Sequence, residues 1–342
     1  MPKRKNNIYF LNCTYEKLYK AYTICKKGKS NRLDVIIFSM DLEMNLKEIL
    51  LDLLNGSYIF SSYKLFYVLE PKKRKILAAR FRDRIVHTWY VNSFILPYFV
   101  PSFINTSYAC IKGRGMHMAA KDVQKGLKTC SKLYTNPYVL KMDITKFFEN
   151  INRNKVYELI ERKIKDGRVL QLTKDILESS SCYDEKRGIS LPIGNYTSQM
   201  FANIYLNELD RFIKDKLKVK WYYRYMDDMV LILPNKGKAR ESLSLIKNFL
   251  SNETIGLNLS LNRKTQIFKL SQGVNFCGYK INVSRMRIRD KGKKKLVQKL
   301  KWIEYNINCG NISVSDAKKY FAGHLGYIKH ADISGIVKKY LS

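Results

Sequence analysis

The chain has 342 residues, and 63 Lys and Arg against 29 Asp and Glu give it a formal net charge of +34 at pH 7. An excess of this size opposes a compact state by self-repulsion, so it predicts a polyanionic partner, with nucleic acid as the first candidate. Because 46% of the residues are hydrophobic and 13% are aromatic, the composition excludes an intrinsically disordered chain.

The composition also argues against a membrane protein or a disulfide-bonded protein. No window approaches the about 20 consecutive apolar residues of a transmembrane helix, and the basic start lacks the apolar run of a signal peptide. The seven cysteines are scattered without a CxxC pair, which predicts reduced thiols in a cytoplasmic protein. With only four histidines, any metal should be a hard cation held by carboxylates.

The N-terminal part of the sequence predicts helices, a strand pair and a further helix. Apolar side chains at helical spacing predict a largely helical region over residues 14–55, which ends at Asn55-Gly56. Tyr58 to Ile76 reads as two strands joined by a turn at Glu70–Lys73. A helix is expected from Asp83 to Ile95.

The middle of the sequence combines a short apolar run with longer helical patterns. Pro137 precedes the run 138–142, which predicts a buried strand that ends at Asp143. Helices are expected over residues 153–180 and from about Thr197 to Lys214.

The last third predicts a hairpin followed by a basic helical tail. Two apolar runs, 221–225 and 229–233, flank Asp227-Asp228 and predict a β-hairpin with two carboxylates at its tip. From about Arg285 the pattern becomes helical, with Lys293, Lys294 and Lys295 beside apolar positions. Such a basic stripe is typical of a surface that binds the phosphate backbone of a nucleic-acid duplex.

Three aspartates carry the chemistry that the sequence predicts. An Asp pair between strands is by itself more often a polar hairpin tip, and Asp143 by itself is more often a helix cap or turn residue. Together, Asp143, Asp227 and Asp228 predict a site for two Mg²⁺ ions, with Mn²⁺ as an alternative. Such ions could activate an attacking hydroxyl and stabilise a leaving pyrophosphate.

The order of motifs along the chain resembles that of the reverse transcriptases. Tyr225-Met226-Asp227-Asp228 resembles motif C of that family, and Asp143-Ile144 with Phe147-Phe148 resembles motif A. Four further resemblances are Arg82–Val86 to a fingers segment, Leu191–Gln199 to motif B, Asn262–Thr265 to motif D, and Phe276–Tyr279 to the primer-grip turn.

The resemblance implies an α+β right-hand polymerase fold. N-terminal helices and fingers, with part of the palm, would occupy residues 1–136. The palm would occupy residues 137–284, with a fingers insertion near 156–190, and a short helical thumb would occupy residues 285–342. The implied activity is RNA-directed DNA polymerisation, in which a template RNA, a primer and dNTPs are the substrates.

The finer pattern resembles the reverse transcriptases of diversity-generating retroelements. Most reverse transcriptases place Gln at the position of Ile193 and Pro at that of Gln199, whereas Ile-Gly-x-x-x-Ser-Gln resembles the retroelement form. Three other segments share this resemblance: Pro71–Ile76, Ser107–Gly115 and Gly323–His330. It implies a bacterial or phage-encoded, error-prone enzyme with errors opposite adenine, and a ribonucleoprotein with a structured RNA and a small basic accessory protein oligomer.

The resemblance also assigns roles to individual residues. Metal would be held by Asp143, Asp227, the more peripheral Asp228 and the main-chain carbonyl of Ile144. The residues implied to bind nucleotide are Lys72, Arg74, Arg80, Arg82, Phe147, Phe148, Ile193, Gly194, Gln199 and Lys264. Those implied to bind primer or template are Tyr225, Met226, Phe276, Cys277, Gly278, Tyr279, Lys293, Lys294 and Lys295.

Several of these residues have a plain structural alternative. In so basic a chain any one Lys or Arg is more often a solvated charge, and Phe148 or Ile193 could simply pack. Two rival functions stay open from the sequence. One is an anti-phage defence reverse transcriptase with the same palm. The other is a non-catalytic RNA-binding scaffold with a polymerase-like fold, against which the three retained carboxylates argue.

Overall fold

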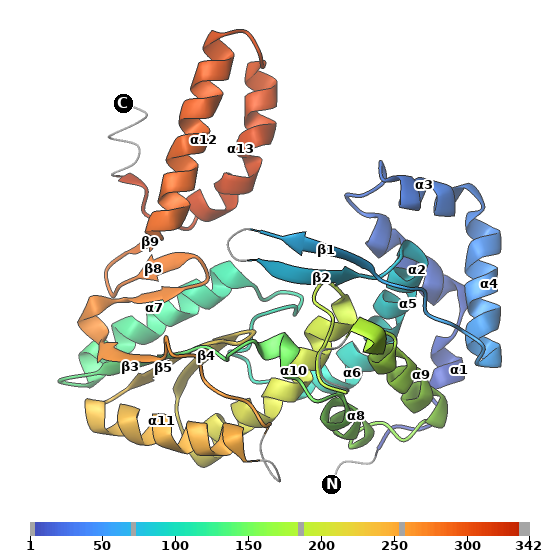
Figure 1. Cartoon of the computed structure of the whole chain (residues 1–342). Helices are drawn as coiled ribbons and strands as arrows, with labels where there is room; N and C mark the ends of the chain where they lie inside the picture. The colour runs from blue at the N-terminus through green and yellow to red at the C-terminus, as the bar shows by residue number, and fades with distance from the viewer. Residues whose placement is uncertain (1–3, 70–72, 184–187, 253–256, 335–342) are drawn as a thin grey trace. The chain divides into compact units, whose positions relative to one another are not determined.

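The computed structural model describes residues 4–69, 73–183, 188–252 and 257–334 (Figure 1). The chain forms two compact units, each built from three segments. Unit 1 comprises Met1–Ile104, Thr145–Phe212 and Asn248–Ser260, and unit 2 comprises Asn105–Ile144, Ile213–Lys247 and Leu261–Ser342.

Unit 1 begins with four helices, which confirm the helical region predicted over residues 14–55. They are α1 (Tyr9–Asn12), α2 (Tyr15–Lys26), α3 (Leu33–Met40) and α4 (Leu42–Asn55). Thr14 caps α2 because its side chain accepts a hydrogen bond from the Lys17 backbone N–H. Gly56 follows α4 with a left-handed φ of 76°, so Asn55-Gly56 ends the helix as predicted.

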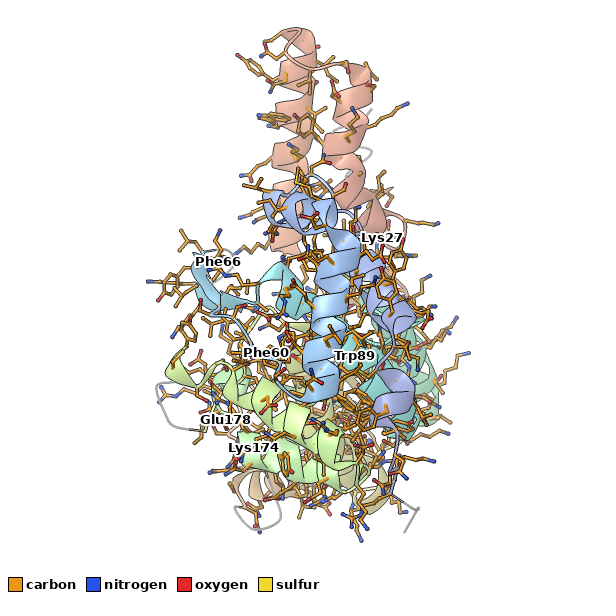
Figure 2. All side chains as sticks on the ribbon, turned by 90° about the vertical axis from the view of Figure 1, so that its right-hand side faces the viewer. Lys27, Phe60, Phe66, Trp89, Lys174 and Glu178 are labelled. Atoms are coloured by element: carbon orange, nitrogen blue, oxygen red, sulfur yellow. The ribbon has the colours of Figure 1, made fainter. Side chains whose placement is uncertain are left out.

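A two-stranded antiparallel ribbon follows in unit 1. It consists of β1 (Lys64–Val68) and β2 (Arg74–Ala78), which confirms the predicted strand pair, although the strands begin later than Tyr58. All of β1 is exposed, and Phe66, labelled in Figure 2, keeps 41% of its surface in contact with solvent. Most of the predicted turn, including Lys72, lies outside the described residues.

The other helical elements of unit 1 follow the predicted order. They are α5 (Phe81–Tyr90), η1 (Val91–Ile95), α6 (Leu96–Phe99), η2 (Val100–Ser102), η3 (Phe147–Glu149), α8 (Arg153–Glu161), α9 (Gly167–Glu178), η4 (Ser181–Tyr183) and α10 (Tyr196–Arg211). The helical region predicted over residues 153–180 is confirmed by α8 and α9, with a break between them. Asp166 interrupts the run and caps α9, since its side chain accepts from the N–H groups of Arg168 and Val169.

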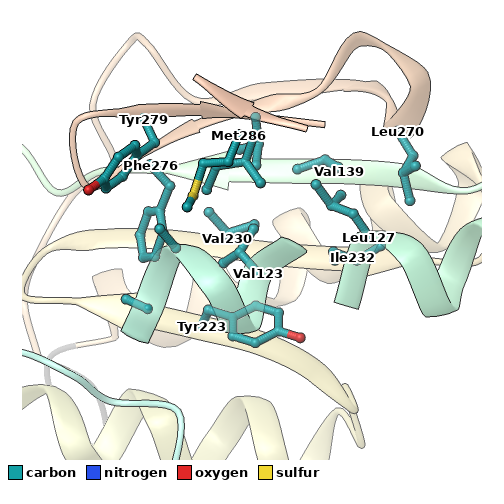
Figure 3. Packing of buried hydrophobic residues seen from close by; sticks show 14 of the residues in the cluster. Val123, Leu127, Val139, Tyr223, Val230, Ile232, Leu270, Phe276, Tyr279 and Met286 are labelled. Carbon is teal, nitrogen blue, oxygen red and sulfur yellow. The ribbon is translucent and has the colours of Figure 1, made fainter. Parts of the chain in front are cut away.

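A four-stranded antiparallel sheet with the order β4-β5-β3-β6 is the centre of unit 2. Its strands are β3 (Tyr138–Met142), β4 (Trp221–Tyr225), β5 (Asp228–Leu233) and β6 (Gln266–Lys269). The predicted buried strand and the predicted hairpin are therefore confirmed. The helix α7 (Met116–Leu133) covers one face of this sheet, where Val123 and Leu127 pack against Val230 and Ile232 (Figure 3).

The remaining described elements are helical segments that precede or separate strands, three short strands, and the two helices of the tail. They are η5 (Phe212–Lys216), α11 (Lys236–Ser251), η6 (Leu270–Gln272), β7 (Val274–Phe276), β8 (Tyr279–Ile281), β9 (Met286–Ile288), α12 (Asp290–Asn308) and α13 (Val314–Ile328). The helical tail predicted from Arg285 starts later, at Asp290. Before it, Met286 and Ile288 bury alternate side chains in strand β9, a period of two that a helix cannot satisfy.

The architecture is of the predicted α+β class, because the sheets are antiparallel and most helices lie in separate stretches of the chain. Within the described ranges, every helix is too short or too polar to cross a bilayer. The division into fingers, palm and thumb stays a prediction.

Candidate active site

The tip of the β4–β5 hairpin carries the predicted aspartate pair. Tyr225 pairs with Asp228, so Met226 and Asp227 form a two-residue turn. Met226 has a left-handed φ of 53°, which tight hairpin turns require but which is costly for a residue other than glycine. Arg224 is fully buried and donates from Nη1 to the Met226 carbonyl at 3.2 Å, so it supports the turn from within the fold.

Asp143 lies at the same end of this sheet. The register pairs Met142 with Met229, so the next residue along β3, Asp143, comes opposite Asp228. The backbone N–H of Asn262 donates to the Asp143 carbonyl at 2.7 Å. Two antiparallel registers within unit 2 thus bring Asp143 to the end of the sheet where Asp227 and Asp228 lie.

Lys141 is a fourth charged residue at this end of the sheet. It precedes Asp143 by two residues in β3 and therefore lies on the same face. Its Nζ forms an ion pair with Asp228 Oδ1 and lies 5.0 Å from the centroid of the Phe276 ring. Burial lowers the pKa of Lys141 from its usual range, while the negative charges of Asp143 and Asp227 raise it and so favour the ammonium.

The chemistry of the three aspartates fits a hard divalent cation, because Mg²⁺ prefers carboxylate oxygens. Their side chains, however, stand in another arrangement. In the part of the chain that the structure describes, no three His, Cys, Asp or Glu side chains are grouped so that they could hold a metal ion. Instead, the ammonium of Lys141 compensates part of the carboxylate charge.

Two other predicted site residues of unit 2 belong to segments connected to Asp143. Ile144 is buried and forms an antiparallel bridge with Leu261. Lys264 is exposed in the following turn, where its backbone N–H donates to Asn262 Oδ1 at 3.0 Å. Because Asn262 is itself bonded to Asp143, the segment that resembles motif D is tethered to this aspartate.

The predicted primer-grip residues form a tight turn in unit 2. Phe276 pairs with Tyr279, and the intervening Cys277 and Gly278 have φ values of 49° and 83°, both positive as a type I′ turn requires. A Cβ on Gly278 would lie 2.8 Å from Cε1 of Tyr327. Burial raises the pKa of Cys277 to about 12, so the thiol is protonated at neutral pH.

The predicted arginines of unit 1 differ in what they contact. Arg74 is exposed on β2, and Arg80 is exposed with Nε donating to the Ser62 carbonyl at 3.3 Å. Arg82 pairs with Asp52 at 2.6 Å, and its guanidinium lies 4.6 Å from the ring centroid of Tyr58. Arg82 therefore has a structural role within unit 1, whereas Arg74 faces solvent.

The segment that resembles motif B is bonded to strand β2. The Leu77 N–H donates to the Ile193 carbonyl at 3.1 Å. The buried side chain of Asn195 accepts from the Ala79 N–H at 3.1 Å and donates to the Leu77 carbonyl at 3.0 Å. Gly194 has a φ of +122°, and a Cβ there would lie 3.1 Å from Ile76 Cγ2. Gln199 follows in α10, half-buried.

Phe147 and Phe148 also meet this segment within unit 1. The Phe147 side chain is buried, Phe148 is half-buried, and their ring centroids are 5.4 Å apart in an edge-on arrangement. The Leu191 N–H donates to the Phe148 carbonyl at 2.8 Å. Phe147 thus has a core position, whereas Phe148, for which core packing was the plain alternative, keeps a partly accessible ring.

The predicted sites are divided between the two units. The described candidates for nucleotide binding belong to unit 1, except Lys264. The candidates for binding metal, primer and template belong to unit 2, including Lys293, Lys294 and Lys295, which are exposed on α12. Within unit 2 the strand registers bring Asp143, Asp227 and Asp228 to one end of the sheet.

Sequence reasoning missed Lys141, Arg224 and Asn195. The first two had a readable signal, because each is a charged residue inside an apolar strand pattern, where a charge needs a partner. Asn195 had none, since its two partners, Leu77 and Ala79, are more than a hundred positions away in the chain.

One family model matches more than half of the chain. The family model described as reverse transcriptase (RNA-dependent DNA polymerase) matches residues 70–281. Protein YkfC of Escherichia coli K12 is 24% identical over 272 residues, which are 69% of this chain and 71% of YkfC.

Two further matches are more partial. The retron Ec73 reverse transcriptase of Escherichia coli is 29% identical over 186 residues, covering 49% of this chain and 52% of that enzyme. The chain therefore spans about half the length of this relative. Apo telomerase from Candida tropicalis, truncated from its C-terminal domain, matches with a TM-score of 0.49 at 13% identity, over 67% of this chain and 55% of that chain.

Proposed function

The chain belongs to the reverse transcriptase (RNA-dependent DNA polymerase) family, whose model matches residues 70–281, and from that premise we propose that it is an RNA-directed DNA polymerase. The proposed reaction joins a primer 3′-hydroxyl to the α-phosphorus of a dNTP opposite a template RNA and releases pyrophosphate. The family generally uses divalent metal ions, and Mg²⁺, or Mn²⁺ in its place, would supply positive charge for the attacking and leaving oxygens.

The observation that carries this proposal is the meeting of three aspartates at one edge of the central sheet of unit 2. Asp143 follows β3 directly opposite Asp228, and Asp227 occupies the turn beside them. Carboxylates at neighbouring positions repel each other, so turning all three side chains toward one point needs a compensating positive charge. We infer that Asp143, Asp227 and the Ile144 carbonyl hold the metal, with Asp228 as the more peripheral ligand.

The other roles follow from exposure and contacts. Among the arginines predicted to bind nucleotide, Arg74 and Arg80 are better placed than Arg82 to meet a triphosphate, since both side chains are exposed and Arg82 is paired with Asp52. We propose that Phe148 is the ring that meets the nucleotide sugar and that Lys264 meets the leaving pyrophosphate. Tyr225, Met226 and the turn Phe276–Tyr279 would then contact the primer end.

The test is primer extension on an RNA template with dNTPs and Mg²⁺. We expect cDNA from the wild type and a loss of about a thousand-fold or more in Asp143→Asn and in Asp227→Asn, because each removes several kcal/mol of charge stabilisation. Asp316→Asn, which changes a carboxylate of α13 paired with Lys319, should keep wild-type yield. A cDNA yield unchanged in Asp227→Asn would contradict the assignment.

We further propose that the enzyme is the error-prone polymerase of a diversity-generating retroelement. Support comes from Ile193, because an apolar side chain at this position offers shape but no hydrogen bond for discriminating a nucleotide. Sequencing of cDNA made on a defined RNA, with and without its native flanking transcript, should find errors confined to template adenines. Uniform errors would count against this subtype, and untemplated DNA synthesis would favour the defence alternative.

The retroelement proposal includes a ribonucleoprotein. The positive excess of +34 suits a structured RNA, and by resemblance a small basic accessory oligomer would join it. Copurification from cells that express the chain with its flanking genes should recover both. RNA binding by a preparation that makes no cDNA, although its three aspartates are intact, would instead favour a non-catalytic scaffold.

A further inference from the structure

We propose that Lys141 is a positioning residue for the aspartates: its ammonium is a built-in counter-cation that keeps metal affinity low until a nucleotide binds. The inference rests on the proposed function, which makes Asp143 and Asp227 metal ligands and Asp228 a peripheral one. It adds to that function a role for Lys141, to which the sequence motifs assign none.

Lys141 is placed by the fold and is not a chance surface charge. The alternation of β3 turns it to the same face of the sheet as Asp143, with Val139 two residues before it in the apolar cluster. Only 19% of its side chain is exposed. Burying an ammonium is costly unless it is paired, so the ion pair with Asp228 is what stabilises a lysine in this place.

Its two contacts explain the retained charge. Nζ pairs with Asp228 Oδ1, and the ring of Phe276, in the turn predicted to grip the primer, offers its face at 5.0 Å. One side chain therefore links β3, the catalytic hairpin and the β7–β8 turn, all within unit 2. The ammonium neutralises one of the three carboxylate charges that the registers bring together.

This placement has a consequence for metal binding. A positive charge already paired with Asp228 repels an arriving divalent cation and competes for the same oxygen. The phosphate oxygens of a dNTP supply the negative charge that the aspartates, partly neutralised by Lys141, do not offer. The site should therefore bind metal weakly in the absence of nucleotide and more tightly in its presence. Metal binding would then depend on the presence of substrate.

The experiment measures Mn²⁺ binding to the full chain from the electron paramagnetic resonance of free Mn²⁺, without nucleic acid, with and without dATP. We expect Lys141→Met to bind Mn²⁺ about ten-fold more tightly than wild type in the absence of dATP, and to gain less from dATP. Lys141→Arg should behave like wild type. Lys269→Met removes an exposed lysine from β6, at the opposite end of the same sheet, and should change nothing.

Thermal melting tests whether the Lys141→Met variant is folded. Without metal, Lys141→Met should melt below wild type because three carboxylates then lack a counter-charge, and Mn²⁺ should restore it. Equal or weaker Mn²⁺ binding in Lys141→Met, with binding still lost in Asp143→Asn and Asp227→Asn, would overturn the role of Lys141 alone. Mn²⁺ binding that survives Asp143→Asn and Asp227→Asn would instead overturn the metal site of the proposed function, and this inference with it.

Discussion

Several residues around the aspartates have a backbone conformation or a buried charge that costs free energy. Contacts with neighbouring residues compensate for this cost. Met226 adopts a left-handed backbone conformation that costs free energy in any residue with a side chain. Arg224 is fully buried, and Lys141 loses solvent around its ammonium. Each of these two charges is compensated by a specific contact, a carbonyl for Arg224 and a carboxylate for Lys141. Such local costs concentrate where a protein must fix the direction of a side chain.

Gly194 gives a test at this scale. Its φ is +122°, and Ile76 Cγ2 lies 3.1 Å from the place that a Cβ would take, so a methyl group has no relaxed position there. We expect Gly194→Ala to lower the free energy of unfolding by about 1–3 kcal/mol. Gly167→Ala, where no atom lies within 4 Å of the added Cβ, should be neutral or stabilising by up to about 1 kcal/mol. Urea denaturation measures both, and equal effects would contradict the strain at Gly194.

At the scale of elements, the segment that resembles motif B depends on two neighbours in unit 1. The loop before α10 is bonded to β2 through Ile193 and Asn195. The first turn of α10 is bonded to α5, where Nδ1 of His87 lies 3.0 Å from Oγ1 of Thr197. His87 is buried and stacks on Phe60, whose ring centroid is 5.3 Å away. Figure 2 labels Phe60. The position of this loop thus depends on a histidine that must stay neutral.

The neutral His87 predicts a pH dependence of stability. Burial lowers its pKa from 6.5 to about 4, so between these values the unfolded chain binds the proton and the folded chain does not. The stabilisation is complete above pH 6.5 and is lost as the pH falls to about 4, by about 3 kcal/mol in total. Urea denaturation in steps from neutral pH down to the folded-state pKa should show this slope, and His87→Phe should flatten it. A slope as steep in His87→Phe as in wild type would assign the pH dependence to other groups.

At the scale of the whole molecule, the charge of +34 is distributed over both units. In unit 2 a compact basic set lies on α12, where Lys293, Lys294 and Lys295 are exposed while Leu296 is buried in the helix's apolar face. Exposed lysines that follow one helix suit the phosphate backbone of a duplex and carry no base specificity. Affinity for a template–primer should therefore be strongly dependent on salt.

Substitution of the α12 lysines tests whether this basic set contributes to duplex binding. Replacement of Lys293, Lys294 and Lys295 by Gln should weaken binding of an RNA–DNA duplex and reduce the slope of log K against log salt by up to about 3. Fluorescence anisotropy across a range of about 50 to 300 mM KCl measures both quantities. A matched triple change of Lys125, Lys128 and Lys132, exposed on α7, should leave the slope nearer to wild type. Equal slopes for both variants would show that binding depends on the total charge of the chain and not on the positions of these lysines.

The sequence by itself determined the class of the protein and the order of its parts. Strand periodicity located β3 and the β4–β5 hairpin, helix periodicity located α2 to α5 and α10, and Asn55-Gly56 marked a helix end. These features are local, because the periodicity of apolar residues, the helix caps and the turn residues each depend on positions only a few residues apart. Boundaries failed where a single local feature, such as the Asp166 cap or the β9 alternation, interrupted a longer pattern.

Only the tertiary structure decided what each charged residue contacts. The register Met142–Met229 brings Asp143 opposite Asp228 across more than eighty positions of sequence, and the same register turns Lys141 toward that carboxylate. Arg82, expected at a triphosphate, is paired with Asp52. The physical reason is that the free energy of a charge depends on burial and on the nearest opposite charge, and both are set by contacts between segments that no local pattern encodes.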